Sequence, residues 1–424
     1  MLRDAFLPPA VSHRFEALFR AVERPAKVRY AEARWNPEAL AMLVAALREG
    51  GGELRAISTE ELLAAWGDTV TKILRPASLE RRALDPALTR LCGLSQLGLE
   101  AALEAVLGGV RREPAAAVFA EARGPAAPEP VLVVLASNLP ALAVQALLPA
   151  LALRRPVLLK SPSAEPLFAP AFLTALARRE PRLAGAVAAA TWPGGEADLE
   201  APVLAGVGTV LAYGESAALA DLERRAPGKV VGYGPKTSLA VVGRDADPRV
   251  AAEGIAQDVA LFDQRGCLSV AAVYTAGDAA ALAAELGEAL AGLARRWPPG
   301  PAPRPALATV QQARLAHEMR GLWIAPLPVR SGTVLLDPDP AFRASPGLRT
   351  VRVHPLADLN RLPALLARWR GRLQGAALAG EDAWSLAPRL TLLGISRFAP
   401  PGELQSPDAS WHNGGIDPLV ALGK

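Results

Sequence analysis

The chain has 424 residues, of which 51% are hydrophobic and 21% are charged, so it can bury the cores of two or more domains. This composition excludes disorder as a description of the whole chain. The 46 basic and 42 acidic residues give a net charge of +4, and the arginines are scattered along the sequence. Because nucleic acids bind clustered positive charge, we predict no nucleic-acid partner.

The N-terminus and the two cysteines indicate where the protein resides. The first residues include Asp4 and Glu16 and lack a long apolar run, so they are not a signal peptide. Cys92 and Cys267 lie far apart and have no cysteine or histidine spacing typical of a zinc site. We therefore predict no metal, no disulfide framework and a cytoplasmic location with reduced thiols.

The first part of the chain, residues 1–125, shows the amphipathic spacing of helices, as in PEALAMLVAALREG. We predict that this helical part packs on the domain that follows. The Pro-rich connector GPAAPEP, at 124–130, separates the two parts.

An apolar stretch at 131–153 approaches the roughly 20 residues that a membrane helix needs. Its interior contains Asn138, Pro140, Gln145 and Pro149, which divide it into a short strand, a polar turn and a helix. This division is typical of a buried strand and helix in an α/β protein. We predict no membrane span.

Short apolar runs, such as PVLLK, VGTVLAY and TSLAVVG, alternate with helical runs up to residue 243. This alternation predicts βαβ units and a parallel sheet, which forms a dinucleotide-binding domain over 126–243. A second α/β block follows at 244–395 and carries Cys267. The segment 396–424 is rich in Pro and Gly but retains Trp411, and we expect it to return to the region between the domains.

Cys267 is the candidate nucleophile. It lies in FDQRGCLSV, between a helix that ends near Phe262 and a strand that begins near Ser269, so a tight turn presents its thiol to a cleft. Alternatively, Cys267 is a small buried hydrophobic residue. That is the usual role of a free cysteine, and we assign it to Cys92.

Three further elements carry polar groups at strand ends. Asn138 follows a strand, where its amide either donates to an oxyanion or caps the next helix. Lys160 ends the run PVLLK, and it either binds the ribose or phosphate of a dinucleotide or stays solvated. A helix opens at Gly214, Glu215 and Ser216, and its free N–H groups favour a phosphate. Since the complete GxGxxG pattern is missing, this glycine alone does not establish a dinucleotide site.

The motifs ASNLPAL, VLLKSPS, LAYGES, GYGPKTSLAVVGRDAD and FDQRGCLS occur in the order and spacing of the aldehyde dehydrogenase superfamily. Together with the closing GELQSPDASWHNGG, they make the chain resemble the acyl-CoA reductase (LuxC-like) branch over about residues 85–424. The resemblance implies two Rossmann-like α/β domains with an active-site cleft between them. It places Asn138 at the oxyanion, Lys160 at the ribose, the helix after LAYGES at the pyrophosphate and Cys267 as the nucleophile.

Two positions depart from the superfamily pattern. Where aldehyde-oxidising members carry the glutamate that activates water, GYGPK has Gly232, so a thioester should be hydrolysed slowly. The same change suits a CoA-acylating aldehyde dehydrogenase, which leaves the direction open. Ser163 stands where NAD-preferring relatives have an acidic residue, and it leaves room for a 2'-phosphate that Lys160, Arg154 or Arg155 could pair with. We predict NADPH, with NADH as the alternative.

The resemblance implies that Cys267 attacks an acyl thioester, fatty acyl-CoA in the first place, and that reduction of the acyl-enzyme releases an aldehyde. The alternatives are a CoA-acylating aldehyde dehydrogenase, a reductase of acyl phosphates or carrier-protein thioesters, and a non-catalytic acyl-binding scaffold. An acyl-transferring partner protein and a homo-oligomer are further expectations. His412, in SWHNGG, acts as a base or, as we favour, makes structural hydrogen bonds.

Overall fold

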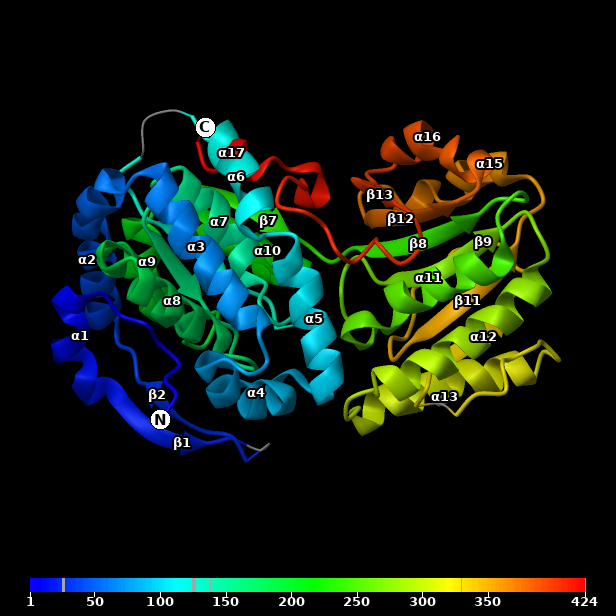
Figure 1. Ribbon diagram of the computed structural model, residues 1–424, viewed down its shortest axis with the longest axis horizontal. Coiled ribbons are helices and arrows are strands. Elements are labelled where there is room, and N and C mark those ends of the chain that lie inside the picture. Colours follow the sequence, from blue (N-terminus) through cyan, green and yellow to red (C-terminus); the bar gives the residue numbers. More distant parts are fainter. Residues whose placement is uncertain (25–26, 124–126, 138, 329, 424) are drawn as a thin grey trace.

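The computed structural model describes residues 1–424 except residues 25–26, 124–126, 138, 329 and 424. The described chain contains a five-stranded and a six-stranded parallel sheet and a small antiparallel pair of strands (Figure 1). Successive strand residues enter different hydrophobic clusters, so both parallel sheets are buried on both faces. The predicted α/β class with parallel sheets is confirmed.

The first parallel sheet has the strand order β5-β4-β3-β6-β7. The chain builds outward from β3 to β5 and then returns to place β6 on the other side of β3. The carboxyl ends of β3 and β6 flank this reversal, which is the usual place for a ligand in such a sheet. The strands are β3 (Val131–Val134), β4 (Val157–Lys160), β5 (Val187–Ala190), β6 (Thr209–Tyr213) and β7 (Lys229–Tyr233). The helices that join them are α7 (Ala143–Ala152), α8 (Phe168–Arg179), α9 (Ala197–Gly206) and α10 (Ser216–Arg225).

The second parallel sheet has the order β10-β11-β9-β8-β12-β13. Its strands are β8 (Thr237–Val242), β9 (Val270–Thr275), β10 (Thr333–Leu336), β11 (Thr350–Pro355), β12 (Leu373–Ala379) and β13 (Arg397–Ala399). The longer helices of this half are α11 (Pro248–Ala260), α12 (Ala279–Arg296) and α13 (Arg304–Glu318). The shorter ones are α14 (Leu362–Leu365), α15 (Glu381–Trp384) and α16 (Ala387–Thr391).

Strand β8 corrects one expectation. We expected residues 237–243 in the first sheet, but β8 pairs with β9 and β12 in the second. Only residues 234–236 connect β7 to β8. Because two parallel neighbours in one sheet need a crossover of a dozen or more residues, this short connection forces β8 into a new sheet. The division of the chain into domains stays a prediction.

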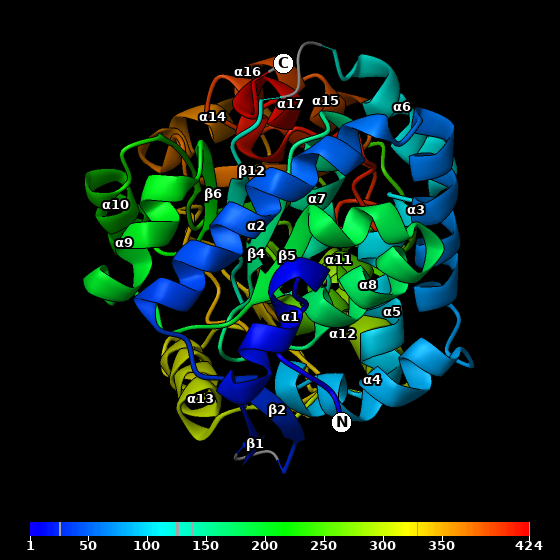
Figure 2. The same cartoon turned by 90° about the vertical axis from the view of Figure 1, so that its left-hand side faces the viewer.

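The N-terminal part is helical, as expected, but it also contains two strands. Strands β1 (Phe19–Glu23) and β2 (Arg29–Ala33) pair antiparallel, an element that the helical interpretation of this region missed. Helix α2 packs against α9 and α3 packs against α8, so these helices cover the first sheet (Figure 2). The helices are α1 (Pro9–Phe15), α2 (Pro37–Ala56), α3 (Thr59–Leu74), α4 (Leu79–Cys92), α5 (Gln96–Gly108) and α6 (Arg112–Glu121).

The C-terminal segment crosses from one sheet to the other. It leaves the second sheet at β13 and ends at α17 (Pro418–Ala421), which packs on α7 beside the first sheet (Figure 1). Arg155 donates to the carbonyl of Leu422 at 2.8 Å, and Lys229 donates to that of Ala421 at 2.7 Å. These bonds fasten the end of the chain to the first half of the molecule.

The apolar stretch at 131–153 forms the predicted strand and helix, β3 and α7. Among the described residues, no single helix is long and apolar enough to cross a membrane. The segments Leu79–Cys92 and Gln96–Glu121 meet that criterion only as a pair, across a bend of 100°.

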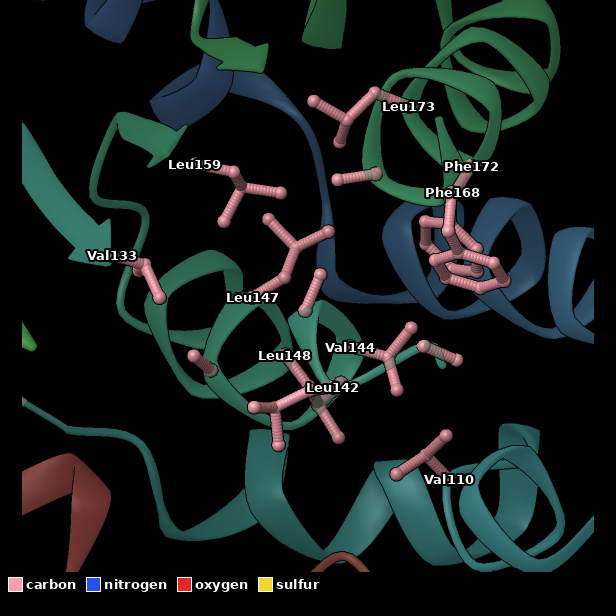
Figure 3. Close-up of a cluster of buried hydrophobic side chains, with 14 of the residues drawn as sticks. Val110, Val133, Leu142, Val144, Leu147, Leu148, Leu159, Phe168, Phe172 and Leu173 are labelled. Carbon is pink, nitrogen blue, oxygen red and sulfur yellow. The ribbon is translucent and has the colours of Figure 1, made fainter. Parts of the chain in front are cut away.

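Leu147 on α7 tests the packing of the first sheet. Its side chain is fully buried among those of β3, β4 and α8 (Figure 3). Because Leu147→Ala would leave a cavity, we expect it to lower the free energy of unfolding by about 2–5 kcal/mol. Leu97→Ala, at a position that is 48% exposed on α5, is the matched control and should change it little. Urea denaturation measures both, and equal effects would contradict this packing.

Candidate active site

A cavity of about 770 Å³ lies between the two parallel sheets, a volume typical of a small-molecule site. The first sheet contributes residues that follow β3 and β6, and the second contributes residues that precede β8 and β9. Residues of the C-terminal segment complete the wall. The cavity therefore joins the carboxyl edge of one sheet to the amino edge of the other.

Cys267 lines this cavity and is half-buried. It follows a short turn of helix, Leu261–Gln264, and precedes β9, as predicted. Its carbonyl accepts a hydrogen bond of 2.8 Å from the Ser238 hydroxyl on β8. At Gly266, a Cβ would lie 2.7 Å from Oε1 of Gln405, so a side chain there would displace an amide that is bonded to Ser269 and Asp258.

The backbone before Cys267 is left-handed at three successive residues, Phe262, Asp263 and Gln264, with φ angles of 56°, 50° and 63°. The Gln264 side chain holds this path in place. Its amide nitrogen donates to the carbonyls of Val270 at 2.8 Å and Thr350 at 2.7 Å, and its oxygen accepts from the Thr350 N–H at 2.7 Å. One buried amide thus ties the turn to β9 and β11.

Asp263 fixes the same turn from its other side. Its carboxylate accepts from Nε of Arg349 at 2.9 Å and from the N–H of Gly300 at 3.0 Å. Both charged side chains are buried, so each needs the other to offset its loss of water. The position of Cys267 therefore depends on residues more than 80 positions further along the chain.

The environment of the Cys267 thiol acts on its charge in opposite directions. Burial raises the pKa of Cys267 to about 11, whereas the N–H groups of Cys267 and Leu268 and the charge of Lys236 act to lower it. Lys236 lines the same cavity. The thiol therefore depends on its neighbours to ionise at neutral pH.

The predicted cofactor residues are only partly brought together. Gly214 and Glu215 line the cavity with Cys267, and Ser216 begins α10 at an exposed position beside them. Ser163 is exposed in the turn after β4 and lies outside the cavity wall. Lys160 is buried at the end of β4, with its ammonium 5.3 Å from the centre of the Trp192 ring.

Burial lowers the pKa of Lys160, and the charge of Glu200 opposes this effect. Because Lys160 faces Trp192 and does not line the cavity of Cys267, a ribose contact at Lys160 stays a prediction. The N-terminus of α10 fits a phosphate better. Its N-cap residue, Glu215, makes no side-chain bond to the first turn in the described chain, so these N–H groups remain available.

The suggestion that Arg154 or Arg155 pairs with a 2'-phosphate is wrong. Both precede β4, whereas Lys160 ends it, so they lie at the opposite edge of the sheet. Arg155 is buried and donates to Thr209 at 3.1 Å and to the Leu422 carbonyl at 2.8 Å. Arg154 likewise donates to the carbonyl of Ile57 at 3.3 Å and to the Thr59 hydroxyl at 3.0 Å. Their charges serve structural bonds.

Two other expectations concern the rim of the site. Asn138, the predicted oxyanion donor, lies outside the described residues, although its neighbours Ser137 and Leu139 line the cavity. His412 is exposed and is not among the described residues of the cavity wall, and its role as a base or as a structural residue stays a prediction. The adjoining Trp411 and Asn413 do line the cavity.

Several residues of the site escaped sequence reasoning, namely Lys236, Ser238, Gln264 and Gln405. Gln264 gave a weak signal, since the polar run DQR, at 263–265, is unusual for a turn that must be buried. The contact of Gln405 with Ser269 spans 136 residues, and no local pattern indicates it.

Solved aldehyde dehydrogenase structures share this fold. A putative aldehyde dehydrogenase from Burkholderia cenocepacia matches with a TM-score of 0.72 at 16% identity, over 98% of this chain and 96% of that chain. An NADP-dependent glyceraldehyde-3-phosphate dehydrogenase from Bacillus halodurans, complexed with NADP, matches with a TM-score of 0.69 at 17% identity, over 90% and 87%. Aldehyde dehydrogenase C from Pseudomonas syringae, in complex with NAD+ and octanal, gives 0.69 at 16%, over 90% and 85%. The fold is that of the aldehyde dehydrogenase superfamily, as predicted.

The family model described as acyl-CoA reductase (LuxC) matches residues 97–424, most of the chain. The chain therefore belongs to this family, and the predicted resemblance is confirmed. It is an oxidoreductase that acts on acyl or aldehyde groups. No curated protein matches the chain in sequence.

Gln264 tests how the turn is held. Gln264→Ala would remove three buried hydrogen bonds, each worth about 0.5–1.5 kcal/mol, while Thr350 keeps its bonds to Gly347 and Ser345. We expect a lower urea midpoint and slower alkylation of Cys267. Gln311→Ala, at an exposed position on α13, is the control. If Gln264→Ala is as stable as this control, the hydrogen bonds of Gln264 to β9 and β11 are dispensable.

Proposed function

We propose that this chain reduces an acyl thioester, fatty acyl-CoA in the first place, to an aldehyde through a covalent acyl-enzyme on Cys267. The observation that carries the proposal is a half-buried thiol in a cavity that is also lined by Gly214 and Glu215, directly before the N-terminus of α10. A nucleophile and a dinucleotide can therefore meet at one acyl carbon. The family and the fold support the same chemistry.

The reaction begins with the Cys267 thiolate, whose sulfur forms a bond to the thioester carbonyl carbon. The backbone N–H of Cys267 and the predicted donor Asn138 stabilise the oxyanion. When the carbonyl re-forms, the bond to the donor sulfur breaks and that thiol leaves, so Cys267 carries the acyl group. NAD(P)H, when bound, supplies the two electrons and the hydrogen that convert this thioester to the aldehyde level. When the carbonyl of the reduced acyl group re-forms, the bond to the Cys267 sulfur breaks, the aldehyde leaves and the thiolate is restored.

The wall of the cavity suits an acyl chain on one side. Apolar side chains from α5, the loop after β3 and the C-terminal segment gather there, namely Val106, Leu135, Leu139, Leu142 and Ile416. Burial of a hydrocarbon against such a wall stabilises the complex by about 0.8 kcal/mol for each methylene group. This favours an acyl substrate over a small polar aldehyde.

The first turn of α10 would hold the pyrophosphate of the dinucleotide, next to Gly214 and Glu215. Ser163 is small, neutral and exposed, which leaves room for a 2'-phosphate. Loss of Arg154 and Arg155 as partners removes part of the argument for NADPH. NADPH remains the proposed donor, with NADH as the alternative.

Covalent labelling tests the acyl-enzyme. We incubate the folded protein with radioactive acyl-CoA of several chain lengths. Without NADPH, the label should stay on the protein through denaturation. With NADPH added before denaturation, the label should be released as aldehyde. Cys267→Ala should abolish the label. Cys92→Ala, which removes a buried thiol on α4, should keep it and is the matched control. Label retained by Cys267→Ala, or no label on the unaltered protein with any ester, would reject the proposal.

Gly232 tests why the acyl group awaits hydride. Gly232 lines the cavity, and a Cβ there would lie 3.2 Å from a flexible methyl group of Leu219, so a side chain can be accommodated. Gly232→Glu would supply a general base for water, and we expect release of the acyl label without NADPH to rise about tenfold or more. Gly232→Gln is the uncharged control of equal size. Equal release by the two variants would contradict this explanation.

A further inference from the structure

The Cys267 thiol must ionise in a cavity that offers few charges. Apart from Cys267, the ionisable side chains in the described part of the wall are Tyr213, Glu215, Tyr233, Lys236 and Arg265. Histidine and aspartate are absent from that described wall, so the familiar pairing of a thiol with an imidazole is not available there. Of the five groups, only the lysine and the arginine carry positive charge.

The guanidinium of Arg265 binds backbone carbonyls. It donates to the carbonyl of Phe262 at 3.0 Å and to the carbonyl of Cys92, the last residue of α4. These bonds hold the guanidinium toward the helical N-terminal part of the chain. Lys236 is therefore the cation to consider for the sulfur.

The strand register brings Lys236 beside the nucleophile turn. Ser238 on β8 pairs in parallel register with Val270 on β9, and its hydroxyl holds the Cys267 carbonyl at 2.8 Å. Lys236 directly precedes β8, and Cys267 lies three residues before β9. Both residues therefore lie at the amino ends of neighbouring parallel strands, which are about 4.8 Å apart, and both line the same cavity. Lys236 and Cys267 interact electrostatically in both directions, each favouring the charged form of the other.

The surroundings of the Lys236 ammonium also bear on its role. Within the described residues, Lys236 takes part in no ion pair with aspartate or glutamate. The C-terminal segment covers it instead, since a Cβ on Gly414 would lie 3.5 Å from Nζ. A half-buried cation without an acidic partner favours an anion nearby.

We propose that the ammonium of Lys236 is the counter-ion that stabilises the Cys267 thiolate. The proton leaves the sulfur for water, and Lys236 stays protonated throughout the cycle. This inference rests on the proposed function, because it assigns the group that makes Cys267 nucleophilic.

The test follows the alkylation of Cys267 by iodoacetamide as a function of pH. Cys92→Ala serves as the parent, so that Cys267 is the only thiol. In this parent, Lys236→Met and Lys236→Gln should move the midpoint of the pH profile upward by about one unit or more, which is about a tenfold lower rate below the midpoint. Lys236→Arg should keep the profile within about threefold of the parent, because it keeps the charge. Lys72→Met, on α3, controls for the change in net charge.

The outcomes separate the explanations. Unmoved midpoints in both neutral variants, with circular dichroism unchanged, would overturn the proposal. A rate lowered equally at every pH would also overturn it, because that is the signature of a merely structural lysine. If one neutral variant fails to fold, the other and Lys236→Arg still decide. If acyl-CoA acylates the parent but the Lys236 variants leave the midpoint of alkylation unchanged, only the role of Lys236 is rejected. If acyl-CoA does not acylate the parent, the proposed function is rejected.

Discussion

The site depends on one short stretch of backbone that must leave α11 and enter β9 while turning its sulfur toward the other sheet. Three successive residues from Phe262 to Gln264 adopt the left-handed conformation, which costs roughly 1–2 kcal/mol for each residue with a side chain. Such a path persists only when its surroundings determine it. The Gln264 amide and the Asp263–Arg349 pair supply that determination, because they bind the turn to β9 and β11. The chemistry of Cys267 therefore depends on the second sheet as a whole.

The connection between the two sheets explains the position of the cavity. The connection between β7 and β8 is so short that the chain runs from the carboxyl edge of the first sheet directly into the amino edge of the second. Groups that follow β6 and groups that precede β9 then face one space. The C-terminal segment fixes this arrangement, since Asp258 on α11 accepts from the N–H of Gly402 while Arg155 holds the carbonyl of Leu422. An active site formed by two sheets needs bonds of this kind to hold the sheets in a fixed relative position.

Local patterns predicted the elements and the nucleophile, whereas pairings across the chain escaped them. The alternation of apolar and helical runs indicated β3, β4, β6 and β8 but missed β5 and β7, and the ordered motifs, more than the glycine-flanked turn, indicated Cys267. Strand β8 was assigned to the wrong sheet because its sequence does not say which edge it joins. Arg154 and Arg155 looked close to Lys160 in sequence, but a strand of four residues separates them by more than about 13 Å. Lys236 served in the sequence only to align the GYGPK run, since its place beside Cys267 comes from the pairing of β8 with β9.

Under the proposed mechanism, Lys236 and Gly232 together would separate thioester reduction from hydrolysis in this chain. A permanent cation stabilises a thiolate, but it cannot remove a proton from water at neutral pH. A carboxylate at Gly232 would do the reverse, since it would activate water and disfavour the thiolate beside it. The described wall offers the cation and, near Gly232, no carboxylate other than that of the exposed Glu215. The proposed acyl-enzyme requires an active nucleophile and inactive water, and this charge pattern between neighbouring strand ends would provide both.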